Sequence, residues 1–214
     1  MGLTDKRTVL SYGPERAERI KILFQYGFML LGGFFIGALL PSFFSQDTQM
    51  KLADTVAQHF SLPFANCQGW LHRLSLVSYA SAMDWILIGI SFLFSFSVLN
   101  YLISDIVLSY IGFRFGLCIS ILCRLIGAEC NSFVFHRSHL LSFGVFKLLI
   151  VVCLFLYSYR LTSYSYEIKQ TFRNGRASIR LEHLIPLLGL TLICGILIFL
   201  IHVLYGWIIF HISK

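Results

Sequence analysis

The sequence predicts an all-α fold: a polytopic membrane helix bundle with five transmembrane helices and an outer amphipathic helix. Three observations predict it. The 214-residue chain contains five long apolar runs. It is 57% hydrophobic and only 13% charged, against about 25% charged residues in soluble domains. Ten of its 17 Lys and Arg residues lie in two short stretches, 1–21 and 160–180. Long apolar runs span bilayers, and the basic segments beside them stay in the cytoplasm.

Each apolar run is long enough to cross about 30 Å of hydrocarbon at about 1.5 Å per helical residue. Asp84 and Trp85 open the second predicted span, and Ser104 and Asp105 separate it from the third. A tight helical hairpin, or one broken helix pair, is therefore expected at 104–105. The predicted spans cover roughly 22–44, 84–104, 106–127, 139–159 and 185–211.

The predicted domain organisation is a cytoplasmic N-terminal segment, 1–21, followed by one membrane domain, 22–214. The first apolar run is longer than the core of a signal peptide, about 7–15 residues, so we expect an uncleaved span. The charge bias then places the N-terminus in the cytoplasm and the C-terminus outside. Loop 45–83 is expected to face outward and loop 160–184 inward.

The outer loop contains the predicted amphipathic helix, over 48–60. Asp47 is the expected N-cap of a helix beginning at Thr48. Apolar residues then recur near helical spacing, at Met50, Leu52, Val56 and Phe60. Such a helix lies on the outer membrane surface or covers the mouth of the bundle.

The formal charge of +7 does not indicate a nucleic-acid partner, because the basic residues flank apolar runs and form no separate domain. Membrane lipid is the partner that they suit. The sequence contains no G-x-S-x-G, H-E-x-x-H or P-loop motif. We therefore predict that the chain is not an enzyme and has no catalytic residues, cofactor or metal ion.

His136 and His139, with Glu129 and Cys130 upstream, lack the further ligands that a metal site needs, so they are interpreted as interfacial polar residues. The cysteines are interpreted as small apolar helix residues, although a disulfide between Cys67 and Cys130 stays open. The six cysteines are Cys67, Cys118, Cys123, Cys130, Cys153 and Cys194.

Two pairs of glycines form G-x-x-x-G motifs within predicted spans. Gly33 and Gly37 lie in the first span, and Gly112 and Gly116 lie in the third. Small residues let helix backbones approach closely in lipid. The four glycines are candidates for helix packing within the bundle or for binding a partner.

Arg114 and Lys147 lie inside the third and fourth spans. A charge at the centre of a bilayer costs at least about 2.5–3.5 kcal/mol, so such residues face a bundle interior, a wet cavity or a partner. No acidic residue is predicted at the depth of Lys147. Pairing with an acid of another protein and snorkelling to the interface both stay open. His202, in the last span, is interpreted as a hydrogen-bonded packing residue.

The layout resembles the stage II sporulation protein M family over residues 20–211. The segment 32–60 (GGFFIGALLPSFFSQDTQMKLADTVAQHF) is similar to that family's first span and outer helix. Trp85 to Leu117 resembles its second and third spans, and Gly144-Val145-Phe146-Lys147 its fourth. In this chain, Lys147 stands where many members have an acid, and Leu148-Leu149 where proline is frequent.

The resemblance implies a non-catalytic scaffold in a bacterial plasma membrane that anchors or recruits peptidoglycan-remodelling partners such as hydrolases. The residues themselves leave two alternatives open. One is the permease subunit of a small transporter with a separate ATPase, suggested by Arg114, Lys147 and the cytoplasmic loop. The other is an intramembrane enzyme that acts on lipid through Asp84, Asp105, His136 and His139.

Overall fold

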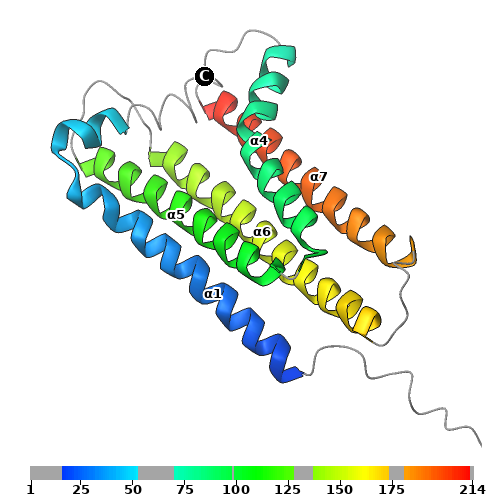
Figure 1. Ribbon diagram of the computed structural model, residues 1–214. Helices are drawn as coiled ribbons and strands as arrows, with labels where there is room; N and C mark the ends of the chain where they lie inside the picture. Colours follow the sequence, from blue (N-terminus) through cyan, green and yellow to red (C-terminus); the bar gives the residue numbers. More distant parts are fainter. Residues whose placement is uncertain (1–15, 53–69, 98, 128–136, 174–180, 213–214) are drawn as a thin grey trace, which may run out of the picture.

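The computed structural model describes residues 16–52, 70–97, 99–127, 137–173 and 181–212 (Figure 1). Five of its helices contain an apolar stretch long enough to cross a membrane, and the described residues form no strand. The prediction of an all-α membrane bundle is therefore confirmed. The elements are α1 (Arg16–Leu39), the 3₁₀ helix η1 (Leu40–Phe43), α4 (Trp70–Phe94), α5 (Asn100–Gly127), α6 (Arg137–Arg173) and α7 (Leu181–Ile212).

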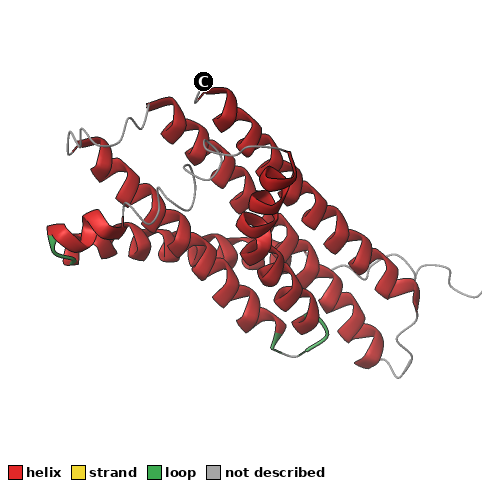
Figure 2. Ribbon diagram, turned by 90° about the horizontal axis from the view of Figure 1, so that it is seen from above, coloured by secondary structure: helices red, strands yellow, loops and turns green. Residues whose placement is uncertain are grey.

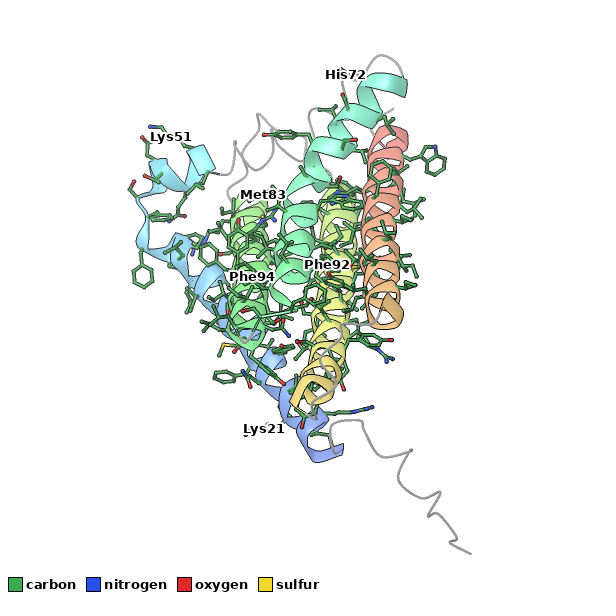
Figure 3. All side chains as sticks on the ribbon, turned by 45° about the vertical axis from the view of Figure 1, so that its right-hand side comes forward. Lys21, Lys51, His72, Met83, Phe92 and Phe94 are labelled. Atoms are coloured by element: carbon green, nitrogen blue, oxygen red, sulfur yellow. The ribbon has the colours of Figure 1, made fainter. Side chains whose placement is uncertain are left out.

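The five helices alternate in direction, so α1, α5 and α7 run one way and α4 and α6 the other (Figure 1). Helix α1 lies at one edge and packs mainly on α5, whereas α7 packs on α4 and α6. In Figure 2 the short connections at 44–45 and 95–97 are the loops between helical segments. Figure 3 places Lys21 at one end of the bundle, here called the N-terminal end, and Lys51 and His72 at the other, the far end.

The helices form a bundle with a small apolar core and a large apolar exterior. Leu108, Leu161 and Ile198 are fully buried between helices. Phe24 and Leu93 are 75% and 70% exposed, and many other large apolar side chains also point outward. In lipid such side chains meet acyl chains and need no protein cover. The exterior is thus what a membrane-spanning bundle requires.

The predicted boundaries of the second span, 84–104, were wrong. Helix α4 begins at Trp70, so 70–83 belong to the helix and not to the outer loop. This segment is rich in serine, which lowers its hydropathy. The serine hydroxyls donate back to carbonyls one turn earlier, from Ser75 to His72 at 2.8 Å and from Ser78 to Leu74 at 2.9 Å. Such bonds hide the polar atoms and let serine enter an apolar helix.

The hairpin between α4 and α5 lies at 95–99 and not at Ser104 and Asp105, which are inside α5. The Ser95 hydroxyl donates to the Phe92 carbonyl at 2.6 Å. The Ser97 N–H donates to the Phe94 carbonyl at 2.9 Å, and the Ser97 hydroxyl accepts from the Leu99 N–H at 3.1 Å. The turn is therefore closed by serines within an apolar run, where hydropathy cannot locate it.

Helix α6 is longer than predicted. It continues to Arg173, and its apolar stretch ends at Tyr166, so the predicted cytoplasmic loop 160–184 was wrong over 160–166, which belong to the span. The polar residues Ser158, Thr162 and Ser165 are each at most 2% exposed and face other helices. Polar side chains that hydrogen-bond between helices lower the hydropathy of a segment without ending its span.

A helix does follow η1, over 46–52, but its cap differs from the predicted one. The hydroxyl of Ser45 accepts from the N–H of Thr48 at 3.4 Å. Asp47 instead lies in the first turn and pairs with Lys51 at 3.8 Å. The prediction that Asp47 caps the helix was therefore wrong. Val56 and Phe60, the rest of the predicted amphipathic pattern, lie outside the described residues.

Candidate functional site

A cluster of ionisable side chains lies between four helices. Asp84 comes from α4, Arg114 from α5, Lys147 from α6 and His202 from α7. All four positions fall inside the apolar stretches of their helices, in the half of the bundle nearer the far end. Asp84 lies there because α4 begins at Trp70, which places this residue midway along the apolar stretch Leu74–Phe94.

Asp84 is the centre of the cluster, and each of its oxygens has a different partner. Arg114 Nη1 lies 3.4 Å from Oδ1, and His202 Nε2 lies 3.0 Å from Oδ2. The side chains of Asp84 and His202 are only 5% and 4% exposed, and that of Arg114 is 28% exposed. The guanidinium of Arg114 also lies over the ring of Tyr110, at 5.8 Å. These contacts connect α4 to both α5 and α7.

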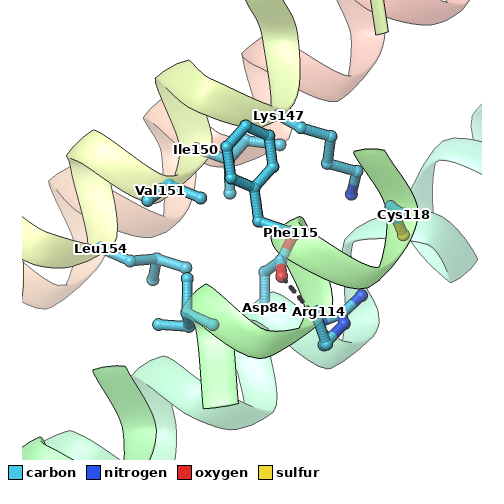
Figure 4. A pocket seen from close by; sticks show the side chains of 9 residues that line it. Asp84, Arg114, Phe115, Cys118, Lys147, Ile150, Val151 and Leu154 are labelled. Carbon is cyan, nitrogen blue, oxygen red and sulfur yellow. Dashed lines mark hydrogen bonds and ion pairs between the residues drawn. The ribbon is translucent and has the colours of Figure 1, made fainter. Parts of the chain in front are cut away.

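Lys147 reaches from α6 toward the same space, next to Asp84, Arg114 and Cys118 (Figure 4). The four side chains line a cavity of about 30 Å³, and the rest of its lining is apolar. A cavity of this size has room for a water molecule or two beside the charged groups. A second cavity, of about 10 Å³, lies between Lys147 and His202. Lys147 therefore lies between two small cavities whose linings are mainly apolar. The apolar lining of the first cavity is Ile111, Phe115, Ile150, Val151 and Leu154.

The charge balance of the cluster is positive. Among the residues that line the two cavities, one carboxylate, that of Asp84, faces the side chains of Arg114 and Lys147, which both ordinarily carry a positive charge. His202 adds a further basic group. In a medium of low dielectric constant these charges interact far more strongly than in water. Because basic groups outnumber acidic ones, the cluster is suited to binding another anionic charge or to exchanging a proton.

The structure brings the predicted residues Arg114 and Lys147 together and adds Asp84 and His202. Sequence reasoning considered Asp84 only for an enzyme that acts on lipid, and interpreted His202 as a packing residue. The expectation that no acid lies at the depth of Lys147 was wrong, because the second span had been started at Asp84 itself. The prediction for His202, a hydrogen-bonded residue, is confirmed by its contact with Asp84. Starting the span at Leu74 would have placed Asp84 well inside the membrane.

The four candidate glycines lie elsewhere, in the contact between α1 and α5. A Cβ atom at Gly33 or Gly37 would meet the backbone of Ser109 or Phe113. A Cβ atom at Gly112 or Gly116 would meet the carbonyl of Leu30 or Phe34. The two G-x-x-x-G motifs thus face each other and let two parallel helices touch backbone to backbone. All four glycines are buried by this contact, which leaves their faces no room for a partner.

A second polar network, which contains no basic side chain, lies in the half of the bundle nearer the N-terminal end. The hydroxyls of Tyr26 and Thr162 are 2.6 Å apart and join α1 to α6. Gln25 Nε2 donates to Asp105 Oδ2 at 2.7 Å and joins α1 to α5. The other oxygen of Asp105 is buried and has no hydrogen-bond partner among the residues that the structure describes. This network fixes the edge helix α1 to the rest of the bundle.

No group of three or more His, Cys, Asp or Glu residues suited to a metal ion occurs within the described ranges. Glu129, Cys130 and His136 lie outside those ranges, as does the side chain of His139. Cys67 and Cys130 are likewise outside them, so their disulfide is untested. The described cysteines, Cys118, Cys123, Cys153 and Cys194, are all free thiols.

Comparisons with known proteins returned no match: no family, no curated protein and no solved structure is similar to this chain.

Proposed function

We propose that this protein is the membrane-embedded subunit of a small transporter, and that the cluster of Asp84, Arg114, Lys147 and His202 is its charge-handling site. A single observation carries the proposal: four ionisable side chains from four different helices meet inside the apolar part of the bundle. Each such residue costs at least about 2.5–3.5 kcal/mol when unpaired in lipid. A bundle without a function beyond holding its helices together would gain little stability from ionisable residues at these positions.

The chemistry of the cluster indicates the kind of solute. Arg114 and Lys147 outnumber Asp84, so the cluster favours an anion over a cation. The adjoining cavity, about 30 Å³, limits it in this conformation to a body of roughly the size of water. A small inorganic anion, moved alone or together with a proton, fits both constraints.

The test is anion flux in proteoliposomes that contain the purified full-length chain. We expect chloride efflux above that of empty liposomes. Lys147→Met keeps an unbranched side chain but removes the charge, and it should abolish most of the flux. Arg124→Gln is the matched control, since Arg124 is exposed and bonds Ser42 and Gln49, away from the cluster. Absence of flux from a folded wild-type protein would contradict the proposal.

A second candidate is the non-catalytic scaffold implied by the resemblance to the stage II sporulation protein M family. One observation favours it: Asp84 is satisfied on both oxygens by Arg114 and His202, as expected of a closed structural core. Such a scaffold would recruit peptidoglycan-remodelling proteins in a bacterial plasma membrane. Co-purification of a cell-wall hydrolase after mild detergent extraction, at native expression level, tests it. A chain that purifies alone counts against it.

Both candidates assume that the N-terminus is cytoplasmic, as the basic residues Arg19, Lys21 and Arg160 near the N-terminal end suggest. Cysteine labelling tests this in a background without native cysteines. A cysteine at Ser45, which is exposed near the far end, should react with an impermeant maleimide in intact cells. A cysteine at Lys21 should react only after the cells are opened. The reverse pattern would invert the proposed topology.

A further inference from the structure

A larger polar cavity, of about 210 Å³, lies near the N-terminal end of the bundle, away from the charged cluster. Its lining comes from two helices. Helix α1 contributes Arg19, and two adjacent turns of α6 contribute Tyr159, Arg160, Ser163 and Tyr164. The apolar stretch of α1 begins at Arg19, and that of α6 ends at Tyr166. The cavity is therefore at the level where a span meets the membrane surface, which is the depth of lipid headgroups.

The two arginines of this cavity differ from the other described arginines whose contacts are known. Arg114 and Arg124 each donate to an acceptor on another helical segment. Arg19 and Arg160 have no acidic partner within the ranges that the structure describes, and both are exposed. Guanidinium groups present several donors in one plane and match the oxygens of a phosphate better than an ammonium does. Two of them at one cavity form a site for an anion.

The tyrosines supply further donors. Tyr159 and Tyr164 are half-buried, and neither hydroxyl makes a hydrogen bond to any described residue. The hydroxyl of Ser163, in contrast, already donates to the Tyr159 carbonyl at 3.1 Å. Phenol hydroxyls commonly lie at the membrane interface, where one end of the ring is apolar and the other is wet. The cavity therefore offers two charged and two neutral donors.

The surface that continues from the cavity into the membrane is apolar. One helical turn deeper than Arg19 is Leu23, which is 42% exposed, and one turn deeper than Arg160 is Leu156, which is 53% exposed. A free phosphate ion would make no favourable contact with these two apolar side chains. A phospholipid would place its phosphate against the arginines and its acyl chains against the leucines. The apolar continuation thus favours a lipid as the source of the phosphate.

We propose that the cavity between α1 and α6 is a binding site for the phosphate group of an anionic phospholipid, held by Arg19 and Arg160 and completed by Tyr159 and Tyr164. The site is independent of the charged cluster and of any transport or scaffolding activity. A bound lipid would bridge α1 and α6, which are joined in this half of the bundle by the hydrogen bond between Tyr26 and Thr162.

Native mass spectrometry of the delipidated full-length protein tests the proposal. The probes are phosphatidylglycerol, phosphatidylcholine and inorganic phosphate, each titrated separately. We expect a tightly retained phosphatidylglycerol, weaker phosphatidylcholine and no retained inorganic phosphate. Arg19→Gln and Arg160→Gln should each weaken phosphatidylglycerol binding by at least about tenfold, the effect of losing a hydrogen bond between charged groups. Tyr164→Phe should weaken it less.

Lys21→Gln is the matched control, because it removes the same charge from the same end of α1 at a residue that does not line the cavity. It should weaken the lipid affinity by no more than about fivefold, the general effect of one basic residue near an anionic surface. Equal losses in Lys21→Gln and Arg19→Gln would indicate a diffuse charge effect and overturn the site. Unchanged binding in the two arginine variants would overturn it as well. Competition by inorganic phosphate at the same concentration as the lipid would overturn the assignment to lipid.

Discussion

Helix α5 takes part in two contacts that are built on opposite principles. On one face, Gly112 and Gly116 bring its backbone against α1. On the opposite face, Arg114 and Cys118 take part in the charged cluster with α4 and α6. Residues two apart on an α-helix point about 160–200° from each other, so both contacts fit on one helix. The first contact depends on the absence of side chains and the second on their charge.

The difference concerns what each contact tolerates. The glycine contact is apolar, and its strength comes from close approach of two backbones, so any added atom reduces it. The charged cluster is held by a few polar interactions in a medium of low dielectric constant, so its stability depends on the balance of charges. The two contacts should therefore respond to different substitutions.

The largest effect is expected for Asp84→Asn. This substitution keeps the shape of the side chain but leaves the half-buried Arg114 without its counter-charge, and it removes the carboxylate that lines the cavity beside Lys147. Removing one partner of a buried pair costs about 3–5 kcal/mol of unfolding free energy. Unfolding of the purified protein by titration with sodium dodecyl sulfate, followed by circular dichroism, measures the loss.

Asp105→Asn is the control for that experiment, since it makes the same change at a half-buried position of α5. Asp105 accepts from Gln25, an uncharged partner, and its second oxygen has no partner among the described residues. We expect a change of no more than about 1 kcal/mol, because an amide oxygen also accepts from Gln25. Equal losses of unfolding free energy in the two variants would show that the charge of Asp84 stabilises the bundle no more than that of Asp105.

Substitution of a glycine in the contact between α1 and α5 should destabilise the protein for steric reasons. In Gly112→Ala the new methyl group would meet the carbonyl of Leu30, which belongs to a helix backbone and cannot rotate away. Overpacking of this kind costs about 1–3 kcal/mol. Gly32→Ala is the control, because a Cβ at Gly32 has open space around it. Thermal unfolding in detergent should show a lower midpoint for Gly112→Ala, and an unchanged or higher one for Gly32→Ala.

The sequence predicted the glycine contact far better than the charged cluster, and the reason is physical. G-x-x-x-G is a local pattern, and its spacing by itself places Gly33 and Gly37 on the same face of the helix. The cluster joins residues as far apart in the chain as Asp84 and His202. Its recognition depends on the depth of every helix, and the depth of α4 was misjudged.

The misjudged depth arose from serine. Hydropathy counts the hydroxyls of Ser75 and Ser78 as polar, whereas in α4 they bond to carbonyls of their own helix. The same count missed the turn at 95–99, where the serines instead close a hairpin inside an apolar run. Serine thus lies in the span in one place and ends it in another. Only the hydrogen bonds of the folded chain distinguish these two roles.

A smaller effect is expected in the second polar network, where it joins α1 to α6. Tyr26→Phe removes the hydroxyl that lies 2.6 Å from that of Thr162. A hydrogen bond between neutral groups contributes about 1 kcal/mol, less than the charged pair of Asp84. A double-mutant cycle with Thr162→Val isolates the term. A coupling energy near zero would show that this hydrogen bond does not stabilise the contact between α1 and α6.

The smallest effect is expected at the far end of the bundle, where Arg124 of α5 donates to Ser42 at 2.6 Å and to Gln49 at 2.8 Å. Exposed contacts of this kind contribute only about 0–1 kcal/mol, so Arg124→Gln should leave the unfolding midpoint almost unchanged. The helix over 46–52 should nevertheless open more often, because Gln49 lies within it. Hydrogen–deuterium exchange of this segment should be faster in the variant.

Lys51→Gln is the control for this exchange experiment, since it removes a charge from the same short helix but leaves both contacts of Arg124 intact. Lys51 pairs with Asp47 at the helix surface, where both side chains are more than four-fifths exposed. Its loss should therefore change the exchange of 46–52 less than the loss of Arg124. If 46–52 exchanges at the same rate in both variants, Arg124 does not stabilise this segment. Arg124 would then differ from Arg114 both in its exposure and in having no stabilising contact.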